Sequence, residues 1–261
     1  MAKTIVVTSG KGGVGKSSIS VNLAYALCDN GYRVCLIDAD FGLKNLDVML
    51  GLENRTIYDM QDVIEGKCSI EQALIKDKRY KTLSLLPACK SLQFKDMNND
   101  YMKNMINVIK LKYDYIIIDS PAGVEKGFAY AISLVQEAIV VVNLDIASLR
   151  DADRVVGLLM KEGIHNISMI INKVNNEDIQ SQRSLMIEDA SDILSLPILG
   201  IVYEDHLMIE ANNRGIPLYL NPHSIIHSCF KNIAMRIEGK TVPFVTQKKL
   251  SFIQKLLKIN A

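Results

Sequence analysis

A glycine-rich stretch near the start of the chain has the composition of a phosphate-binding loop. Residues 10–17 read Gly-Lys-Gly-Gly-Val-Gly-Lys-Ser and follow an apolar run that is typical of a strand. Glycines let several backbone N–H groups converge on a phosphate, while Lys16 can reach the β- and γ-phosphates and the Ser17 hydroxyl can bind Mg²⁺. A chance glycine-rich turn is the alternative, but this one lies between an expected strand and an expected helix. The stretch therefore predicts an ATP- and Mg²⁺-binding site that includes Gly10, Lys11, Gly12, Gly13, Val14, Gly15, Lys16 and Ser17.

Carboxylates that serve this site are expected at the carboxyl ends of neighbouring strands, where open α/β sheets bind ligands. Asp119 follows the apolar run 115–118, and Asp38 and Asp40 follow the run 34–37. Elsewhere, an Asp at a strand end often caps a helix or forms a turn. Here we expect Ser17, Asp38 and Asp119 around Mg²⁺, and either Asp38 or Asp40 beside the attacking water.

The rest of the chain alternates short apolar runs with helical patterns, which is typical of a parallel sheet covered on both faces. A helix is expected over 17–30, ending at Gly31, and Ser69 to Gln72 have the spacing of a capping box. Right-handed crossovers then give an α/β fold with three layers and a doubly wound, mostly parallel sheet. Strands are expected at 4–8, 34–37, 83–86, 115–118, 139–142, 168–171 and 198–202.

Composition limits the possible partners and the compartment. Thirty Lys and Arg against 29 Asp and Glu give a net charge of +1, so no overall field attracts nucleic acid. The five cysteines form no CxxC pair, which favours a reduced, cytosolic protein over an iron–sulfur carrier. Apolar runs are far shorter than the roughly 20 residues that cross a bilayer.

Lys11 adds a second cation to the loop, and this arrangement resembles the deviant Walker A motif of the ParA/MinD family of SIMIBI-type P-loop ATPases. Residues 36–40, 40–47, 119–125 and 148–154 also resemble motifs of this family, so the resemblance spans nearly the whole chain. It implies a homodimer that forms with ATP, in which Lys11 reaches the phosphates of the partner copy. Lys11, Lys16 and Asp40 are then the catalytic residues. Without the resemblance, Lys11 is an ordinary surface lysine.

The resemblance also assigns roles to single positions. It places Asp40 on the attacking water, Ser18 near the α-phosphate and Asn45 in the switch I loop. It places Asn172 at the adenine edge, with Asp205 on the same side, although a strand-end Asn is commonly a turn residue. This chain departs from the family pattern at two places. It has Tyr203 where the pattern usually has Pro, and Leu144-Asp145 where the pattern usually has Pro-Glu. A charged helical face matches the positions that meet a MinC-like inhibitor and a MinE-like activator, namely Arg150, Asp151 and Asp153.

The C-terminal segment has an amphipathic pattern. On a helical wheel its apolar residues occupy one half, and no acidic residue follows Lys248. Such a helix either docks on its own domain or lies on an anionic membrane, and the family resemblance favours the membrane. We therefore expect an ATPase domain over 1–246 and a membrane-targeting helix over 247–261. Its expected membrane residues are Leu250, Phe252, Ile253, Lys255, Leu256 and Leu257.

Together these features and the family resemblance predict a cytosolic ATPase that binds the inner face of the cell membrane when ATP-bound, and the resemblance implies that it helps place the division site. Two alternatives come from the same superfamily. A DNA-partitioning ATPase would need a basic patch that the near-neutral charge does not favour. A flagellar-number ATPase usually has an extension before the loop, where this chain has nine residues before Gly10.

Overall fold

The described residues fold around one mixed sheet. The computed structural model describes residues 2–40, 45–89, 99–123, 126–133 and 135–247. The strand order is β3-β4-β2-β5-β1-β6-β7-β8, and every neighbouring pair is parallel except β3 and β4. The strands are β1 (Lys3–Thr8), β2 (Val34–Asp38), β3 (Ile75–Lys76), β4 (Leu83–Leu86), β5 (Tyr115–Asp119), β6 (Glu137–Val142), β7 (Asn166–Val174) and β8 (Ile198–Tyr203).

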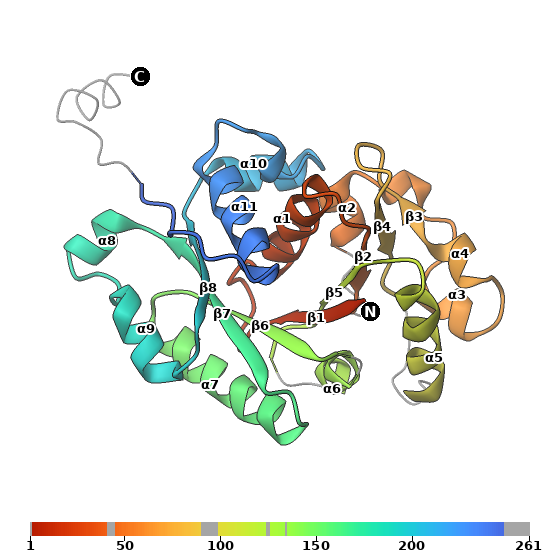
Figure 1. Ribbon diagram of the computed structural model, residues 1–261, viewed down its shortest axis with the longest axis horizontal. Helices are drawn as coiled ribbons and strands as arrows, with labels where there is room; N and C mark the ends of the chain where they lie inside the picture. Colours follow the sequence, from red (N-terminus) through yellow and green to blue (C-terminus); the bar gives the residue numbers. More distant parts are fainter. Residues whose placement is uncertain (1, 41–44, 90–98, 124–125, 134, 248–261) are drawn as a thin grey trace.

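Helices cover both faces of this sheet, which completes the three layers. Figure 1 shows α1, α10 and α11 on one face and α6, α7 and α9 on the other. The helices are α1 (Lys16–Asp29), α2 (Leu46–Leu50), α3 (Met60–Ile64), α4 (Ile70–Ala73), α5 (Asn99–Lys110), α6 (Lys126–Ile132), α7 (Ile146–Lys161), α8 (Asn176–Gln180), α9 (Ile187–Leu194), α10 (Leu207–Asn213) and α11 (Ile225–Ile237). Short 3₁₀ turns occupy η1 (Glu53–Arg55) and η3 (Leu218–Leu220).

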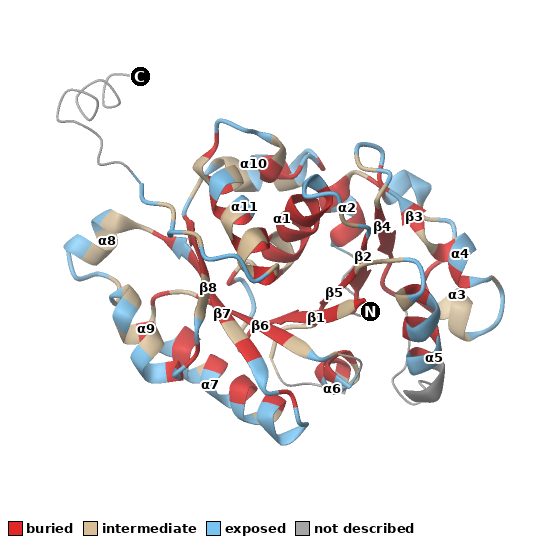
Figure 2. Cartoon of the chain, viewed as in Figure 1, coloured by how far each residue is buried: buried red, intermediate tan, exposed pale blue. Residues whose placement is uncertain are grey.

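Burial explains why the strands are continuous apolar runs. All five residues of β5 are buried, and Ile116 and Ile117 are fully inaccessible. Burying an Ile side chain contributes about 1.5–3 kcal/mol, so a strand covered on both faces gains from an apolar residue at every position. Figure 2 shows this buried centre along the strands and α1, with exposed residues on the outer helices.

α1 is also buried on nearly all sides, because it lies between the sheet and α11. Its predicted bounds, 17–30, differ from the observed Lys16–Asp29 by one residue at each end. The capping box at Ser69 is confirmed, and it starts α4. β3 was not predicted, because two residues carry no detectable periodicity.

The predicted α/β architecture is therefore confirmed, with all seven expected strands present. Among the residues that the structure describes, no helix has the length and apolar character needed to span a bilayer. The six expected membrane residues, from Leu250 to Leu257, lie outside the described residues.

Candidate functional site

The glycine-rich loop joins β1 to α1 and forms one wall of a cavity of about 830 Å³. Gly13 and Gly15 have φ values of 79° and 95°, a left-handed backbone conformation that side-chain-bearing residues rarely adopt. A Cβ on Gly15 would also lie 2.3 Å from Nδ2 of Asn172. Backbone conformation therefore favours glycine at both positions, and at Gly15 the lack of space for a side chain requires it as well.

Gly10 has a different structural role from the other loop glycines. A Cβ at this position would lie 2.2 Å from the carbonyl carbon of Asp151 and 2.5 Å from the amide nitrogen of Ala152, both in α7. Gly10 is not among the residues that line the cavity. It lets the loop backbone touch the α7 backbone, and its predicted contact with a nucleotide stays a prediction.

Lys16, Ser17 and Asp119 converge at the start of α1. The Lys16 ammonium lies 3.4 Å from Oδ1 of Asp119, and the Ser17 hydroxyl donates to Oδ2 over 2.6 Å. The Ser20 hydroxyl donates to the same carboxylate over 2.8 Å, a contact that the loop motif does not include. Lys16 is 7% exposed and Asp119 is 1% exposed, so Lys16 and Ser17 line the cavity floor and Asp119 lies buried behind them.

Asp38 lies beside Asp119, because β2 and β5 are neighbours and the two residues are in register. Burial, and then the charge of Asp119, raise the pKa of Asp38 to about 7, although three backbone N–H groups donate to its carboxylate. Two adjacent buried carboxylates with a hydroxyl at Ser17 form a set of hard oxygen donors that a divalent cation would stabilise. The residues present therefore fit Mg²⁺.

Asp40 lines the cavity, as expected for a residue that contacts the attacking water. Partial burial is the main cause that raises its pKa, and Asp119 adds to this while Lys16 opposes it. Asn45 lines the same cavity, and its backbone N–H donates to Asp38 over 3.4 Å. The position of Asp40 is compatible with the predicted catalytic role, which remains to be tested.

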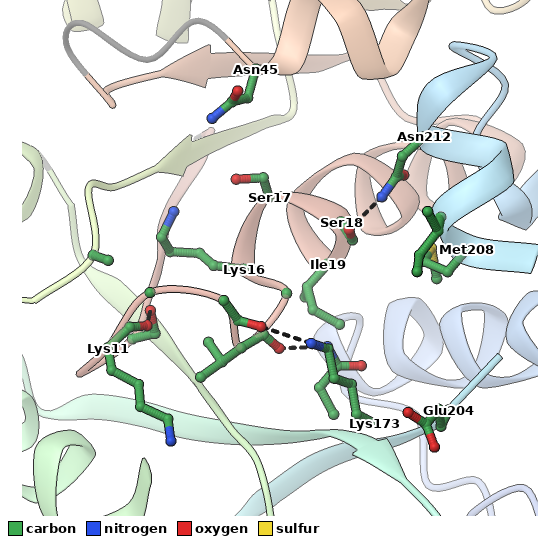
Figure 3. A pocket seen from close by; sticks show the side chains of 18 of the residues that line it. Lys11, Lys16, Ser17, Ser18, Ile19, Asn45, Lys173, Glu204, Met208 and Asn212 are labelled. Atoms are coloured by element: carbon green, nitrogen blue, oxygen red, sulfur yellow. Dashed lines mark hydrogen bonds between the residues drawn. The ribbon is translucent and has the colours of Figure 1, made fainter. Parts of the chain in front are cut away.

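Lys11 leaves the loop in the opposite direction to Lys16 (Figure 3). Its ammonium lies 3.0 and 3.2 Å from the two carboxylate oxygens of Asp145. Asp145 is the N-cap of α7 and accepts from the Ser148 N–H over 2.8 Å. Burial works against ionisation of Asp145, but these hydrogen bonds and the Lys11 charge outweigh it and lower the pKa of Asp145.

The far end of the cavity is formed by the last residues of β7 and by the end of β8 with the residues that follow it. Asn172 donates through Nδ2 to the Val14 carbonyl over 2.7 Å, and Lys173 donates through Nζ to the Gly13 carbonyl over 2.8 Å. Asp205 lines the cavity here, as expected, and its Oδ1 accepts from the Leu207 N–H over 3.0 Å. Asn172 is thus bonded to the loop, and its contact with adenine stays a prediction.

Sequence reasoning missed the contribution of α10. Asn212 donates to the Ser18 hydroxyl over 3.1 Å (Figure 3), and Met208 and Ile209 add apolar surface to the cavity. Asn212 is 194 residues from Ser18, so no local pattern connects them. Lys173 was also missed. Its φ of 56° is unusual for a non-glycine residue, but this conformation is visible only in the structure.

The three predicted partner-contact residues lie on α7. Arg150 and Asp153 are exposed, and Asp151 is half-buried with a carboxylate oxygen 3.8 Å from Arg154. The backbone of Asp151 is the surface that Gly10 touches. One helix therefore presents these charges outward and contacts the phosphate-binding loop inward.

Comparison with known proteins identifies the family. A model described as the CobQ/CobB/MinD/ParA nucleotide binding domain matches residues 5–218. The chain belongs to this MinD/ParA family. It is 46% identical to the septum site-determining protein MinD of Synechocystis sp., over 94% of this chain and 92% of that protein.

Two solved structures of MinD/ParA family members are also similar. The MinC:MinD cell division protein complex of Aquifex aeolicus matches with a TM-score of 0.89 and 42% identity, covering 95% of this chain and 100% of that one. The septum site-determining protein MinD of Pyrococcus horikoshii, complexed with Mg-ADP, matches with a TM-score of 0.80 and 29% identity, covering 91% and 96%. As a MinD/ParA family member, this chain is a nucleotide-binding ATPase that uses ATP and Mg²⁺.

Proposed function

We propose that this ATPase is a membrane switch in division-site placement. Two copies dimerise with ATP, bind the inner face of the cell membrane and recruit a MinC-like inhibitor, and a MinE-like partner stimulates hydrolysis and release. The relatives named above support the cellular role, since they are septum site-determining proteins and one was solved with MinC.

The observation that carries the dimer proposal is the position of Lys11. Lys16 already supplies a buried cation at the cavity floor, whereas the Lys11 ammonium is directed out of the loop onto Asp145. Both members of this pair are about one-third to one-half exposed, so the pair is weak and is easily exchanged. A phosphate of the nucleotide bound to a second copy offers Lys11 a stronger partner than Asp145. The phosphate carries more negative charge, and in a dimer the contact would be shielded from water.

Hydrolysis then depends on charge placed around the transferred phosphoryl group. Lys16 and the loop N–H groups hold the β- and γ-phosphates, and Asp40 orients the attacking water. Ser17, Asp38 and Asp119 would hold Mg²⁺, which would supply further charge neutralisation for the phosphates. Lys11 of the second copy completes the site, so we expect slow turnover in a monomer.

Partner control is proposed to act through α7. A protein bound at Arg150 and Asp153 would press on a helix whose N-cap holds Lys11 and whose backbone touches Gly10. Since these two contacts flank the loop, a small shift of α7 changes the loop directly. The chemical step and the partner surface are thereby linked by one rigid element.

Membrane binding is proposed to use residues 247–261. Each Lys near an anionic surface contributes about 1 kcal/mol, so one short helix binds weakly. In a dimer the second helix inserts at a high effective concentration, which raises the apparent affinity without any new contact. Nucleotide state would then control membrane residence.

The membrane proposal predicts ATP-dependent binding to anionic vesicles. The full chain should sediment with phosphatidylglycerol vesicles in ATP, and about ten-fold less in ADP, because only the dimer engages two helices. A chain that ends at Gln247 is the control and should stay in the supernatant with either nucleotide. Equal sedimentation in ATP and ADP would refute the proposal, and retention on duplex DNA in ATP would instead support the DNA-partitioning alternative.

The dimer proposal predicts a specific defect in Lys11→Ala. This variant should bind ATP with near-normal affinity, because Lys11 lies outside the buried cluster of Lys16, Ser17 and Asp119. It should nevertheless stay monomeric in ATP, as measured by light scattering. Lys112→Ala is a matched control, since it also removes an ion-paired lysine, 2.6 Å from Glu71 and outside the cavity. Lys112→Ala should dimerise normally. Dimerisation of Lys11→Ala at wild-type concentrations would exclude a role in trans.

A further inference from the structure

A segment after α11 crosses toward the far end of the nucleotide cavity. We call residues 241–247 the strap; they form neither helix nor strand. In Figure 1 the strap leaves α11 and runs past β8 toward α8. Because it has no ladder of backbone hydrogen bonds of its own, its position depends on the side chains that hold it.

The first half of the strap is held by α11. The Arg236 guanidinium donates to the Val242 carbonyl over 2.8 Å and lies 4.2 Å from the centre of the Phe244 ring. Asn232 donates through Nδ2 to the Pro243 carbonyl over 2.9 Å. Neither Asn232 nor Arg236 lines the nucleotide cavity, so these contacts are independent of what the cavity contains.

The second half is held by the two segments that close the cavity. The Tyr203 hydroxyl donates to the Val245 carbonyl over 2.9 Å, and Asn176 donates through Nδ2 to the Gln247 side chain over 3.3 Å. Tyr203 ends β8, lines the cavity and is 7% exposed. Asn176 lies shortly after the cavity residue Lys173.

These two closing segments are themselves joined. The Glu204 N–H donates to the Val174 carbonyl over 3.0 Å, and Asn175 donates through Nδ2 to the Glu204 carboxylate over 3.1 Å. A ligand that restrains one segment therefore restrains the other. The strap is consequently attached to the nucleotide cavity at one end and to α11 at the other.

We propose that Tyr203 is a positioning residue that couples nucleotide occupancy to the strap. A tyrosine side chain has two side-chain torsions, so a ligand that packs beside its ring also limits where its hydroxyl can lie. Nucleotide binding then strengthens the hydrogen bond to Val245 and holds the strap. The contact needs a hydroxyl at this position, which the Tyr203 side chain supplies.

This coupling goes beyond the proposed function, because it requires nucleotide binding but neither a membrane nor a protein partner. Coupling between two sites is reciprocal. If nucleotide stabilises the Tyr203 contact, then the contact must raise nucleotide affinity by the same factor. A single neutral hydrogen bond makes that factor roughly two- to ten-fold.

Hydrogen–deuterium exchange of the full chain tests the proposal. In the wild type, Mg-ADP should slow exchange of the strap amides several-fold relative to the nucleotide-free protein. Tyr203→Phe keeps the ring and removes only the hydroxyl, so the strap should lose this nucleotide-dependent protection. The dissociation constant for ADP should rise roughly two- to ten-fold in the same variant. Asn232→Ala is the control, because it loosens the strap at α11 and should raise exchange in both states while keeping the nucleotide-dependent difference.

Three results would overturn the coupling. The first is wild-type strap exchange that is equal with and without ADP, as expected for a static cover. The second is full nucleotide-dependent protection in Tyr203→Phe. The third is lost protection with an unchanged ADP affinity, which contradicts reciprocity. Because vesicles are absent from this experiment, failure here is separate from failure of the membrane proposal.

Discussion

Replacing Lys16 by Gln is expected to lower ATP hydrolysis at least about 100-fold, the usual effect of removing one preorganised donor from a transition-state site. Lys16 is the buried cation of the loop and lies 3.4 Å from Asp119, so its ammonium is held where charge on the phosphates must be neutralised. Gln is one bond shorter than Lys and carries no charge. The measurement is phosphate release at saturating ATP, with ATP affinity determined separately.

Lys173→Gln is the matched control for this experiment. Lys173 also has its ammonium on the loop, 2.8 Å from the Gly13 carbonyl, but its side chain is exposed at the outer end of the cavity. Solvent screens a charge there, so we expect less than a ten-fold loss of hydrolysis. Hydrolysis by Lys16→Gln within ten-fold of the wild type would contradict the role assigned to the buried lysine.

Gly10→Ala is expected to destabilise the nucleotide-free protein by at least about 2 kcal/mol, in the range measured for overpacked cores. The added Cβ would lie 2.2 Å from the carbonyl carbon of Asp151, which is a backbone atom, and the Cβ itself is fixed by the backbone at residue 10. No change of rotamer can relieve the contact, so either the loop or α7 must move. Urea unfolding without nucleotide measures the loss, and hydrolysis should fall as well because the loop is displaced.

Gly12→Ala separates this contact from a general effect of alanine in the loop. A Cβ on Gly12 has no neighbour within 4 Å, and Gly12 is not among the glycines with positive φ. Alanine at such a site changes the free energy of unfolding by less than about 1 kcal/mol. If Gly10→Ala unfolds at the same urea concentration as Gly12→Ala, the packing of the loop against α7 is not what Gly10 provides.

Much of the fold and part of the site were predictable because their signals are local. The run 115–118 is apolar at every position, which is what a strand covered on both faces requires, and Asp119 follows it at the edge where ligands bind. Lys16 and Ser17 follow glycines whose backbone conformations other residues rarely adopt. Each of these signals lies within about ten residues, so the chain itself specifies it.

The remaining parts of the site depend on contacts between distant residues. Asp145 holds Lys11 from 134 residues away, and Asn212 reaches Ser18 from 194 residues away. Gly10 has the motif of a phosphate-binding glycine, yet its close neighbour is the backbone of α7. Sequence patterns report spacing along the chain and contain no record of which helix will pack on which loop.

By itself, the sequence determined the glycine loop, its two lysines, the strand-end carboxylates and the parallel sheet, since backbone conformation and hydrophobic burial act residue by residue. Only the tertiary structure decided that Lys16 lies buried on Asp119 while Lys11 lies on Asp145, and that Tyr203 joins the cavity to the strap. The physical reason is that the environment of a charge or hydroxyl depends on packing between elements. The order of residues along the chain does not specify that packing.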